Sequence, residues 1–178
     1  EIQKNADPIR AKNLRWCFKT GKGEYGEGDV FIGLTVPLSR KIAHQFKGLN
    51  LNEISQLLKS KIHEERLIAL LILIYNFENT SPTNQEKIFK FYLRSTKYIN
   101  NWDLVDLSAH KILGVYLRSQ SKQKTRALLI RLVHSKNIWE RRIAVLTTFN
   151  FIKYNRFNES LLLARFLIND QHDLIHKA

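Results

Sequence analysis

The segment Ser60-Lys-Ile-His63-Glu64-Glu65-Arg66 decides the fold, because its layout returns three more times along the chain. In each copy a His or Trp ring is followed at once by an acidic residue, at the expected start of a helix. The other copies lie at 99–103, 135–142 and 169–173, and their rings are Trp102, Trp139 and His172. The four rings, at positions 63, 102, 139 and 172, are separated by 39, 37 and 33 residues.

A period of this size, with two helices in each copy, is typical of HEAT-type helical repeats, whose usual period is about 40–47 residues. The acidic residue lies in the first turn, where the helix dipole favours negative charge. The Ser, Asn or Asp before it can cap the helix. We therefore predict an all-α fold, an α-solenoid of HEAT-like helix pairs with a concave basic face, in one domain that spans residues 1–178.

Apolar residues at helical spacing predict helices along nearly the whole chain. The expected helices cover residues 39–46, 50–59, 64–77, 84–94, 103–117, 122–133, 139–151 and 160–168. Residues 30–36 are rich in β-branched side chains, but Gly33 and Pro37 favour an extended lead-in to the next helix over a strand.

Composition excludes several classes of protein. The apolar fraction of 44% is too high for a disordered basic tail. The longest apolar run, residues 67–75, is far shorter than the roughly 18 residues that a membrane span needs. A single cysteine, Cys17, excludes an internal disulfide and a zinc site of several thiolates, which favours a reducing compartment. The location that we expect is cytoplasmic, of bacterial or archaeal type. Cys17 itself is interpreted as a buried small residue or, less simply, as a reactive thiol.

The charge points to a polyanionic partner. Lys and Arg number 29 against 16 Asp and Glu, and residues 121–178 alone hold 11 basic and 4 acidic side chains. Such an excess attracts nucleic acid and steers it toward the protein. The alternative is a solvated basic surface that only keeps the protein soluble.

Two short motifs carry little specific information. Residues 21–26 match G-x-G-x-x-G, but no strand precedes them and no helix follows, so a dinucleotide site is not expected. Lys19 and Lys22 of this loop could instead lie along a phosphate backbone. His172 and His176 are four residues apart, yet no third metal ligand is evident nearby, which favours a structural role.

Two stretches carry chemistry. Trp102 and Asp106 are four residues apart and therefore share a helix face. A ring beside a carboxylate in a basic protein suits a cationic substrate, although an ordinary helix surface is the alternative reading. Arg141 and Arg142 point about 100° apart on a helix, so we expect one of them to face a phosphate while the other pairs with Glu140 or solvent.

At these residues the sequence resembles the AlkD-type DNA alkylation repair glycosylases, a family of HEAT-like repeat proteins. The resemblance is carried by residues 19–37, 63–73, 98–114 and 139–152, in the expected order. It implies excision of N-alkylated purines such as 3-methyladenine and 7-methylguanine from double-stranded DNA by cleavage of the N-glycosidic bond. It also implies that the enzyme needs no metal and no cofactor.

The resemblance assigns roles residue by residue. Asp106 matches the family's catalytic carboxylate, Trp102 the aromatic residue that packs on the deoxyribose, and Arg142 the arginine that contacts the DNA backbone. Two departures concern activity. Asn101 stands where the characterised glycosylases have a second Trp, and a later family Trp would follow Ala178, so the C-terminal repeat is expected to be incomplete. The alternatives are a HEAT-like module that binds nucleic acid without catalysis and a scaffold for an acidic protein.

Overall fold

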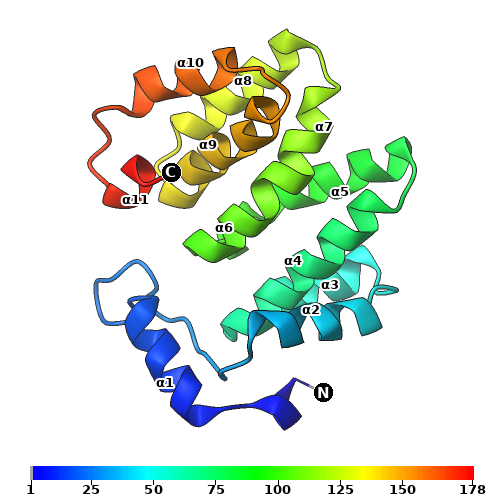
Figure 1. Cartoon of the computed structure of the whole chain (residues 1–178), viewed down its shortest axis with the longest axis vertical. Coiled ribbons are helices and arrows are strands. Elements are labelled where there is room, and N and C mark those ends of the chain that lie inside the picture. The colour runs from blue at the N-terminus through cyan, green and yellow to red at the C-terminus, as the bar shows by residue number, and fades with distance from the viewer. Residues whose placement is uncertain (1) are drawn as a thin grey trace. The chain divides into compact units, whose positions relative to one another are not determined.

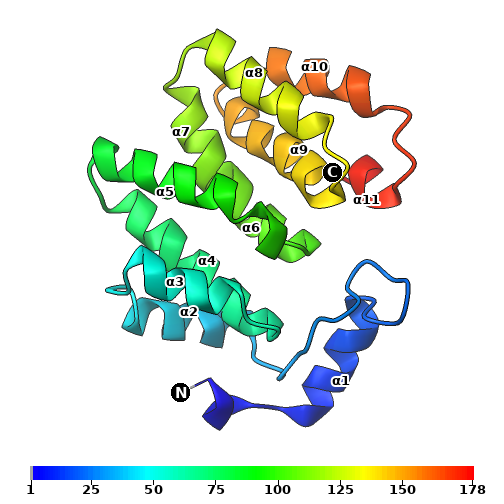
Figure 2. The same cartoon turned by 180° about the vertical axis from the view of Figure 1, so that it is seen from behind.

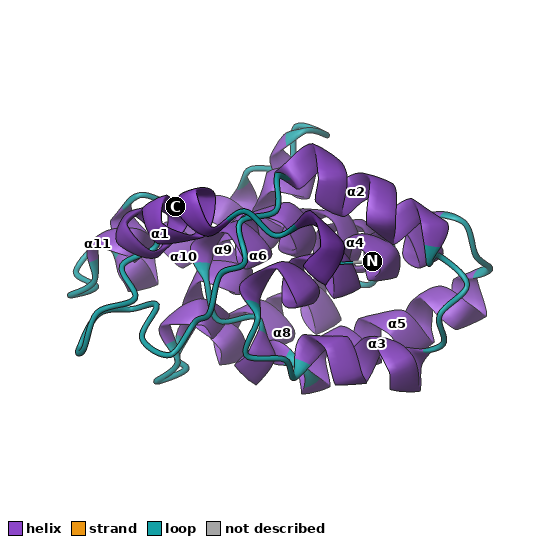
Figure 3. Cartoon of the chain, turned by 90° about the horizontal axis from the view of Figure 1, so that it is seen from below, coloured by secondary structure: helices purple, strands orange, loops and turns teal. Residues whose placement is uncertain are grey.

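The computed structural model describes residues 2–178, and this part of the chain consists of helices and loops without a strand (Figure 3). The prediction of an all-α, solenoid-type fold of stacked helix pairs is confirmed. The chain divides into two compact units, Glu1–Ser81 and Pro82–Ala178. The predicted concave basic face stays a prediction.

The first unit is built around one buried helix. It contains a short 3-10 turn, η1 (Gln3–Asn5), and the helices α1 (Pro8–Cys17), α2 (Val36–Gln45), α3 (Leu51–Leu58) and α4 (His63–Glu78). Both α2 and α3 pack against α4, as Figures 1 and 2 show from opposite sides. Most α4 side chains are buried, which explains why its sequence is apolar on nearly every side.

The second unit stacks helix pairs. Its elements are α5 (Pro82–Arg94), η2 (Thr96–Tyr98), α6 (Trp102–Ala109), the π-helical turn η3 (His110–Gly114), α7 (Val115–Arg118), α8 (Lys122–Val133), α9 (Ile138–Ile152), α10 (Asn158–Leu167) and α11 (Asp173–His176). The elements α6, η3 and α7 follow one another without a break and form one long helix over residues 102–118. Helix α5 packs against its η3–α7 part, and α9 contacts α6, α8, α10 and α11 (Figure 1).

The predicted helices all occur, with small differences at their ends. Helix α2 begins three residues early, because Thr35 caps it and Pro37 occupies its first turn. The expected helix at 103–117 is interrupted by the π-helical turn at His110–Gly114. The extended lead-in is confirmed for residues 30–35, and its only ladder contact is an isolated bridge between Val30 and Ile62.

The repeat is marked by a polar latch at the start of α4. The Ser60 hydroxyl oxygen accepts a hydrogen bond from the Ile62 N–H at 3.0 Å. The Arg66 guanidinium, one turn into the helix, donates back to the Ser60 carbonyl at 3.0 Å. These two bonds satisfy backbone groups that the entry turn would otherwise leave unpaired.

Two further copies carry the same latch. At the start of α9 the Ser135 hydroxyl oxygen accepts from the Asn137 N–H at 3.1 Å, and Arg141 donates to the Ser135 carbonyl at 3.0 Å. At α11 an aspartate replaces the serine and a histidine replaces the arginine, since His176 Nε2 donates to the Asp170 carbonyl at 2.6 Å. The latch fixes the repeat register.

The helix starts, rather than the His and Trp rings, occupy equivalent positions in the four copies of the repeat. The four helices start at residues 63, 102, 138 and 173, which are 39, 36 and 35 residues apart. His63 and Trp102 are therefore first residues of their helices, whereas Trp139 is a second residue and His172 is a cap. The acidic residue lies in the first turn of every copy, as predicted.

Gly114 lets the long helix of the second unit approach α9 closely. A Cβ atom at this position would lie 2.6 Å from the Thr147 carbonyl oxygen and 2.6 Å from the Asn150 Cβ atom. Neither neighbour can retreat easily, because both belong to α9, a central helix of this unit.

We expect Gly114→Ala to lower the free energy of unfolding by about 1–3 kcal/mol, the usual cost of overpacking a core. Gly48→Ala is the matched control, because a Cβ at Gly48 meets nothing within 4 Å and its φ is not positive. Urea denaturation followed by circular dichroism measures both variants. Equal stability of the two variants would contradict this account of the helix contact.

Candidate functional site

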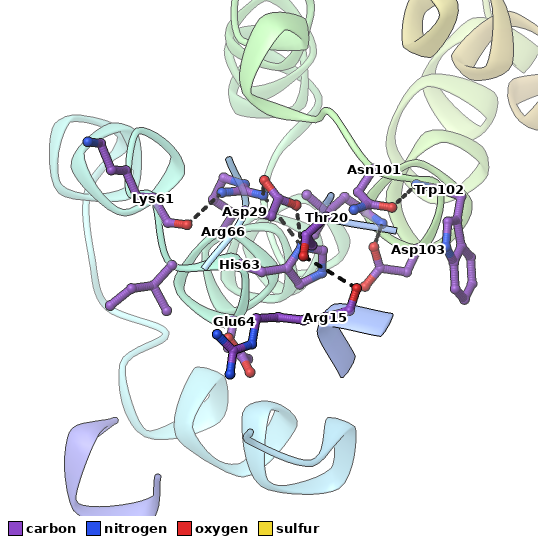
Figure 4. Close-up of polar contacts among 12 residues, drawn as sticks. Arg15, Thr20, Asp29, Lys61, His63, Glu64, Arg66, Asn101, Trp102 and Asp103 are labelled. Atoms are coloured by element: carbon purple, nitrogen blue, oxygen red, sulfur yellow. Dashed lines mark hydrogen bonds and ion pairs between the residues drawn. The ribbon is translucent and has the colours of Figure 1, made fainter. Parts of the chain in front are cut away.

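Asp106 lies in the second turn of α6, and the chain holds this helix firmly. The Asn101 side chain caps it by accepting from the Trp102 N–H at 2.8 Å (Figure 4). In the next turns the Tyr92 hydroxyl, from α5, lies 2.8 Å from the Ser108 hydroxyl. The Ser108 hydroxyl donates to the Leu104 carbonyl at 2.6 Å, so the Tyr92 hydroxyl is the donor to Ser108. Burial raises the pKa of Tyr92 and keeps this donor protonated.

The structure brings Asp106 and Arg142 together. Arg142 Nε donates to Asp106 Oδ1 and Arg142 Nη2 donates to Asp106 Oδ2, both at 2.8 Å. The third nitrogen, Nη1, donates to the Leu174 carbonyl of α11. The Asp106 side chain is 33% exposed, whereas that of Arg142 is 7% exposed. A buried fork therefore holds a carboxylate that remains open to solvent.

Arg141 has a different partner. Its Nε donates to Asp170 Oδ2 at 2.7 Å and its Nη2 to Oδ1 at 3.2 Å. Burial raises the pKa of Asp170, but the hydrogen bonds from Arg141 and the His172 N–H outweigh burial and lower it overall. Glu140 accepts from the Thr96 hydroxyl at 2.7 Å instead. The expected pairing of an arginine with Glu140 or solvent is therefore wrong, because both guanidiniums bind aspartates.

Trp102, Asp106 and His110 follow each other at intervals of four residues along the long helix, so they share one face. All three side chains are half-buried. His110 Nδ1 lies 2.9 Å from the Asp106 carbonyl oxygen, and its ring meets the edge of Phe149 from α9. His110 follows Asp106 at the same four-residue spacing that separates Asp106 from Trp102. The sequence analysis did not identify His110 as a member of this face.

Lys19 and Lys22 belong to the first unit and are exposed on its glycine-rich loop. The Gly26 N–H donates to the Lys19 carbonyl, and a Cβ at Gly26 would lie 2.3 Å from the Phe18 carbonyl oxygen. The backbone N–H groups of Gly21 and Gly23 are taken by the Glu24 and Glu27 carboxylates. The loop can therefore offer a phosphate its lysine side chains, but not these two N–H groups.

A buried polar cluster anchors this loop to α4. Arg66 Nη2 lies 2.7 Å from Asp29 Oδ1, and His63 Nδ1 lies 3.2 Å from Asp29 Oδ2 (Figure 4). The His63 ring stacks on Phe31 with 4.5 Å between the ring centroids. Because all of these groups are buried, Asp29 fixes the end of the loop against the start of α4.

Two other interpretations of the sequence are settled by local geometry. Cys17 is exposed at the end of α1, so its interpretation as a buried small residue is wrong. His172 caps α11 by accepting from the Leu174 N–H, and His176 donates to the Asp170 carbonyl. The two histidines therefore serve the helix end, as the structural reading predicted.

Comparison with known proteins agrees with the fold. The sequence matches a family described as DNA alkylation repair enzyme over residues 1–178. The chain belongs to the DNA alkylation repair enzyme family. A solved structure titled "Predicted DNA alkylation repair enzyme from Enterococcus faecalis" is similar, with a TM-score of 0.68 at 15% identity over 97% of this chain and 78% of that chain. A search of curated proteins finds no match.

Membership in the DNA alkylation repair enzyme family supports a role in DNA repair, with DNA as the partner. Among residues 2–178, no helix has the length and apolar character needed to cross a membrane.

We expect Arg142→Lys to destabilise the protein by about 1–3 kcal/mol, because lysine keeps the charge but cannot serve both Asp106 oxygens and the Leu174 carbonyl together. Arg126→Lys is the matched control. The Arg126 side chain is 44% exposed and its Nε lies 3.8 Å from Glu159 Oε1, so its replacement by lysine should change stability by less than about 0.5 kcal/mol. Urea denaturation compares the two, and equal losses would contradict the special role of the Arg142 fork.

Proposed function

We propose that this member of the DNA alkylation repair enzyme family is a glycosylase that excises N-alkylated purines from duplex DNA. The observation that carries the proposal is the Asp106 carboxylate, which is 33% exposed and oriented through both oxygens by Arg142. Trp102 lies one turn earlier on the same face of α6. A fixed anion beside an aromatic ring suits a substrate whose positive charge grows during the reaction.

Loss of the alkylated base needs no proton donor. An alkylated purine is a cationic leaving group, so it departs without prior protonation and takes the electron pair of the C1′–N bond. Positive charge then develops on the deoxyribose. A carboxylate that is already oriented stabilises this oxocarbenium-like state and can hold the attacking water.

The hydrogen bonds that Asp106 accepts leave its oxygens able to bind the sugar cation and the attacking water. Each carboxylate oxygen accepts one hydrogen bond from Arg142, and each has a further lone pair available. The face of Trp102 adds attraction for the same cationic sugar, about 1–2 kcal/mol when water is excluded. Neither residue requires a metal or a cofactor for this role.

Basic side chains would attract the DNA duplex. Lys19 and Lys22 are exposed on the loop of the first unit, and residues 121–178 hold 11 basic against 4 acidic side chains. Positive charge of this amount draws DNA in without reading its sequence. Such an enzyme would work beside the chromosome in the cytoplasm of a bacterium or archaeon.

We expect Asp106→Asn to reduce the release of 7-methylguanine and 3-methyladenine from methylated duplex DNA by a factor of about 100 or more, because the neutral amide cannot stabilise the sugar cation. Asp173→Asn is the matched control, since Asp173 is an exposed aspartate that pairs with Lys177 on α11. Chromatography of the released bases in single-turnover reactions measures both variants, while a gel-shift assay follows DNA binding.

The outcomes separate the candidate functions. Release by the unaltered chain that Asp106→Asn abolishes and Asp173→Asn leaves intact supports the glycosylase. Duplex binding without release by any variant would favour a binding module. An absence of both would favour a scaffold for an acidic protein.

Replacing Lys19 and Lys22 together by Gln should weaken DNA binding to a similar degree for every sequence. If both lysines contact phosphates, the slope of log K against log salt should become shallower by about two. The double variant Lys41→Gln with Lys59→Gln removes the same charge from other exposed sites of this unit. An equal change in slope for both double variants would refute a specific contact by the loop.

A further inference from the structure

We propose that His110 is a further catalytic residue, which accepts the proton of the attacking water through its Nε2 atom. The inference rests on the proposed glycosylase function and deepens it, because it assigns the second half of the hydrolysis to a named group. It is carried by the position of His110 one turn beyond Asp106 on the same helix face and by the hydrogen bond that fixes its ring.

The hydrogen bond determines which nitrogen can accept. His110 Nδ1 lies 2.9 Å from the Asp106 carbonyl oxygen. A carbonyl oxygen only accepts, so Nδ1 carries the hydrogen and donates. In the neutral ring Nε2 then has a free lone pair. The same bond holds the ring against the backbone of Asp106, so its position is fixed relative to the residue that carries the carboxylate.

The surroundings keep this ring neutral. Burial is the largest influence and lowers the pKa of His110 from its ordinary value. The bond to the Asp106 carbonyl and the Asp106 charge act in the opposite direction, whereas Lys111 and Lys153, at the end of α9, lower the pKa further. The Phe149 ring and the imidazole meet edge to face, with 6.4 Å between the centroids. At neutral pH the ring is therefore a proton acceptor.

The reaction then balances without another reactant. The C1′–N bond breaks and its electron pair passes to the purine nitrogen, which becomes neutral. Water forms the new bond to C1′ and transfers one proton to His110 Nε2. The imidazolium returns this proton to solvent after the products leave. Asp106 holds the developing cation and the water, so the carboxylate need not be protonated during the step.

The chain offers a matched histidine for comparison. His134, at the end of α8, makes the same bond from Nδ1 to the carbonyl four residues earlier, at 2.8 Å from Ile130. Its ring also meets the edge of a phenylalanine, Phe166. His134 thus makes the same two contacts as His110 but has an isoleucine where His110 has Asp106, and it is exposed at the end of its helix.

The test compares His110→Asn with His134→Asn. Asparagine can keep the donor that bonds the backbone carbonyl, but it has no group that titrates between pH 5 and 8. Single-turnover release of 7-methylguanine from methylated duplex DNA is measured across this range with saturating protein, and spontaneous base loss is subtracted. For the unaltered protein the rate should fall as pH drops below the pKa of His110, because a protonated ring cannot accept.

We expect His110→Asn to be about 100-fold slower at neutral pH and to show no fall in rate between pH 5 and 8. His134→Asn should keep the rate and the pH profile of the unaltered protein. If His110→Asn keeps either the original rate or the original fall toward low pH, the inference is overturned.

The two proposals fail in different ways. Loss of release in Asp106→Asn together with an unchanged His110→Asn leaves the glycosylase in place and refutes only the role of His110. If the unaltered protein releases no base, the proposed function fails and the role of His110 fails with it.

Discussion

The forked ion pair between Asp106 and Arg142 is the interaction on which the second unit depends. It joins α6 to α9, and the third nitrogen of the same guanidinium ties α9 to α11. One nearly buried side chain therefore connects the helices α6, α9 and α11. The carboxylate that we assign to catalysis gains its orientation from the bond that joins the repeats, so stability and site geometry share one cause.

This arrangement bears on how Arg142 meets DNA. The resemblance assigns Arg142 to the phosphate backbone, and that assignment stays a prediction. All three of its donor nitrogens bind groups of the protein, and its side chain is 7% exposed. A direct phosphate contact would have to share or break the bond to Asp106, which would release the carboxylate that we assign to catalysis. Orientation of Asp106 is the role that the geometry favours.

Local patterns in the sequence predicted most of the fold, because helix periodicity and capping act over a few residues. The bounds of α8 were predicted without error, and Trp102 and Asp106 were placed on one face by their spacing alone. The contact between Asp106 and Arg142 spans 36 residues and needs the stacking of two repeats, which no local pattern contains. The π-helical turn was also missed, since the apolar spacing at 103–117 fits an unbroken α-helix equally well.

The residues that we assign to catalysis lie on a packed helix, whereas the lysines that we assign to DNA attraction lie on an exposed loop. Asp106 and His110 project from a helix held by Tyr92 of α5, by the fork from α9 and by the close contact at Gly114. Because the groups that we assign to the reaction must be placed to within a fraction of an ångström, a packed helix suits them better than a loop. Attraction of a polyanion tolerates mobility, since it depends on charge rather than on fixed geometry. Exposed lysines of the glycine-rich loop can therefore change with little effect on the chemistry, whereas any change that loosens α6 reaches the carboxylate and the imidazole together.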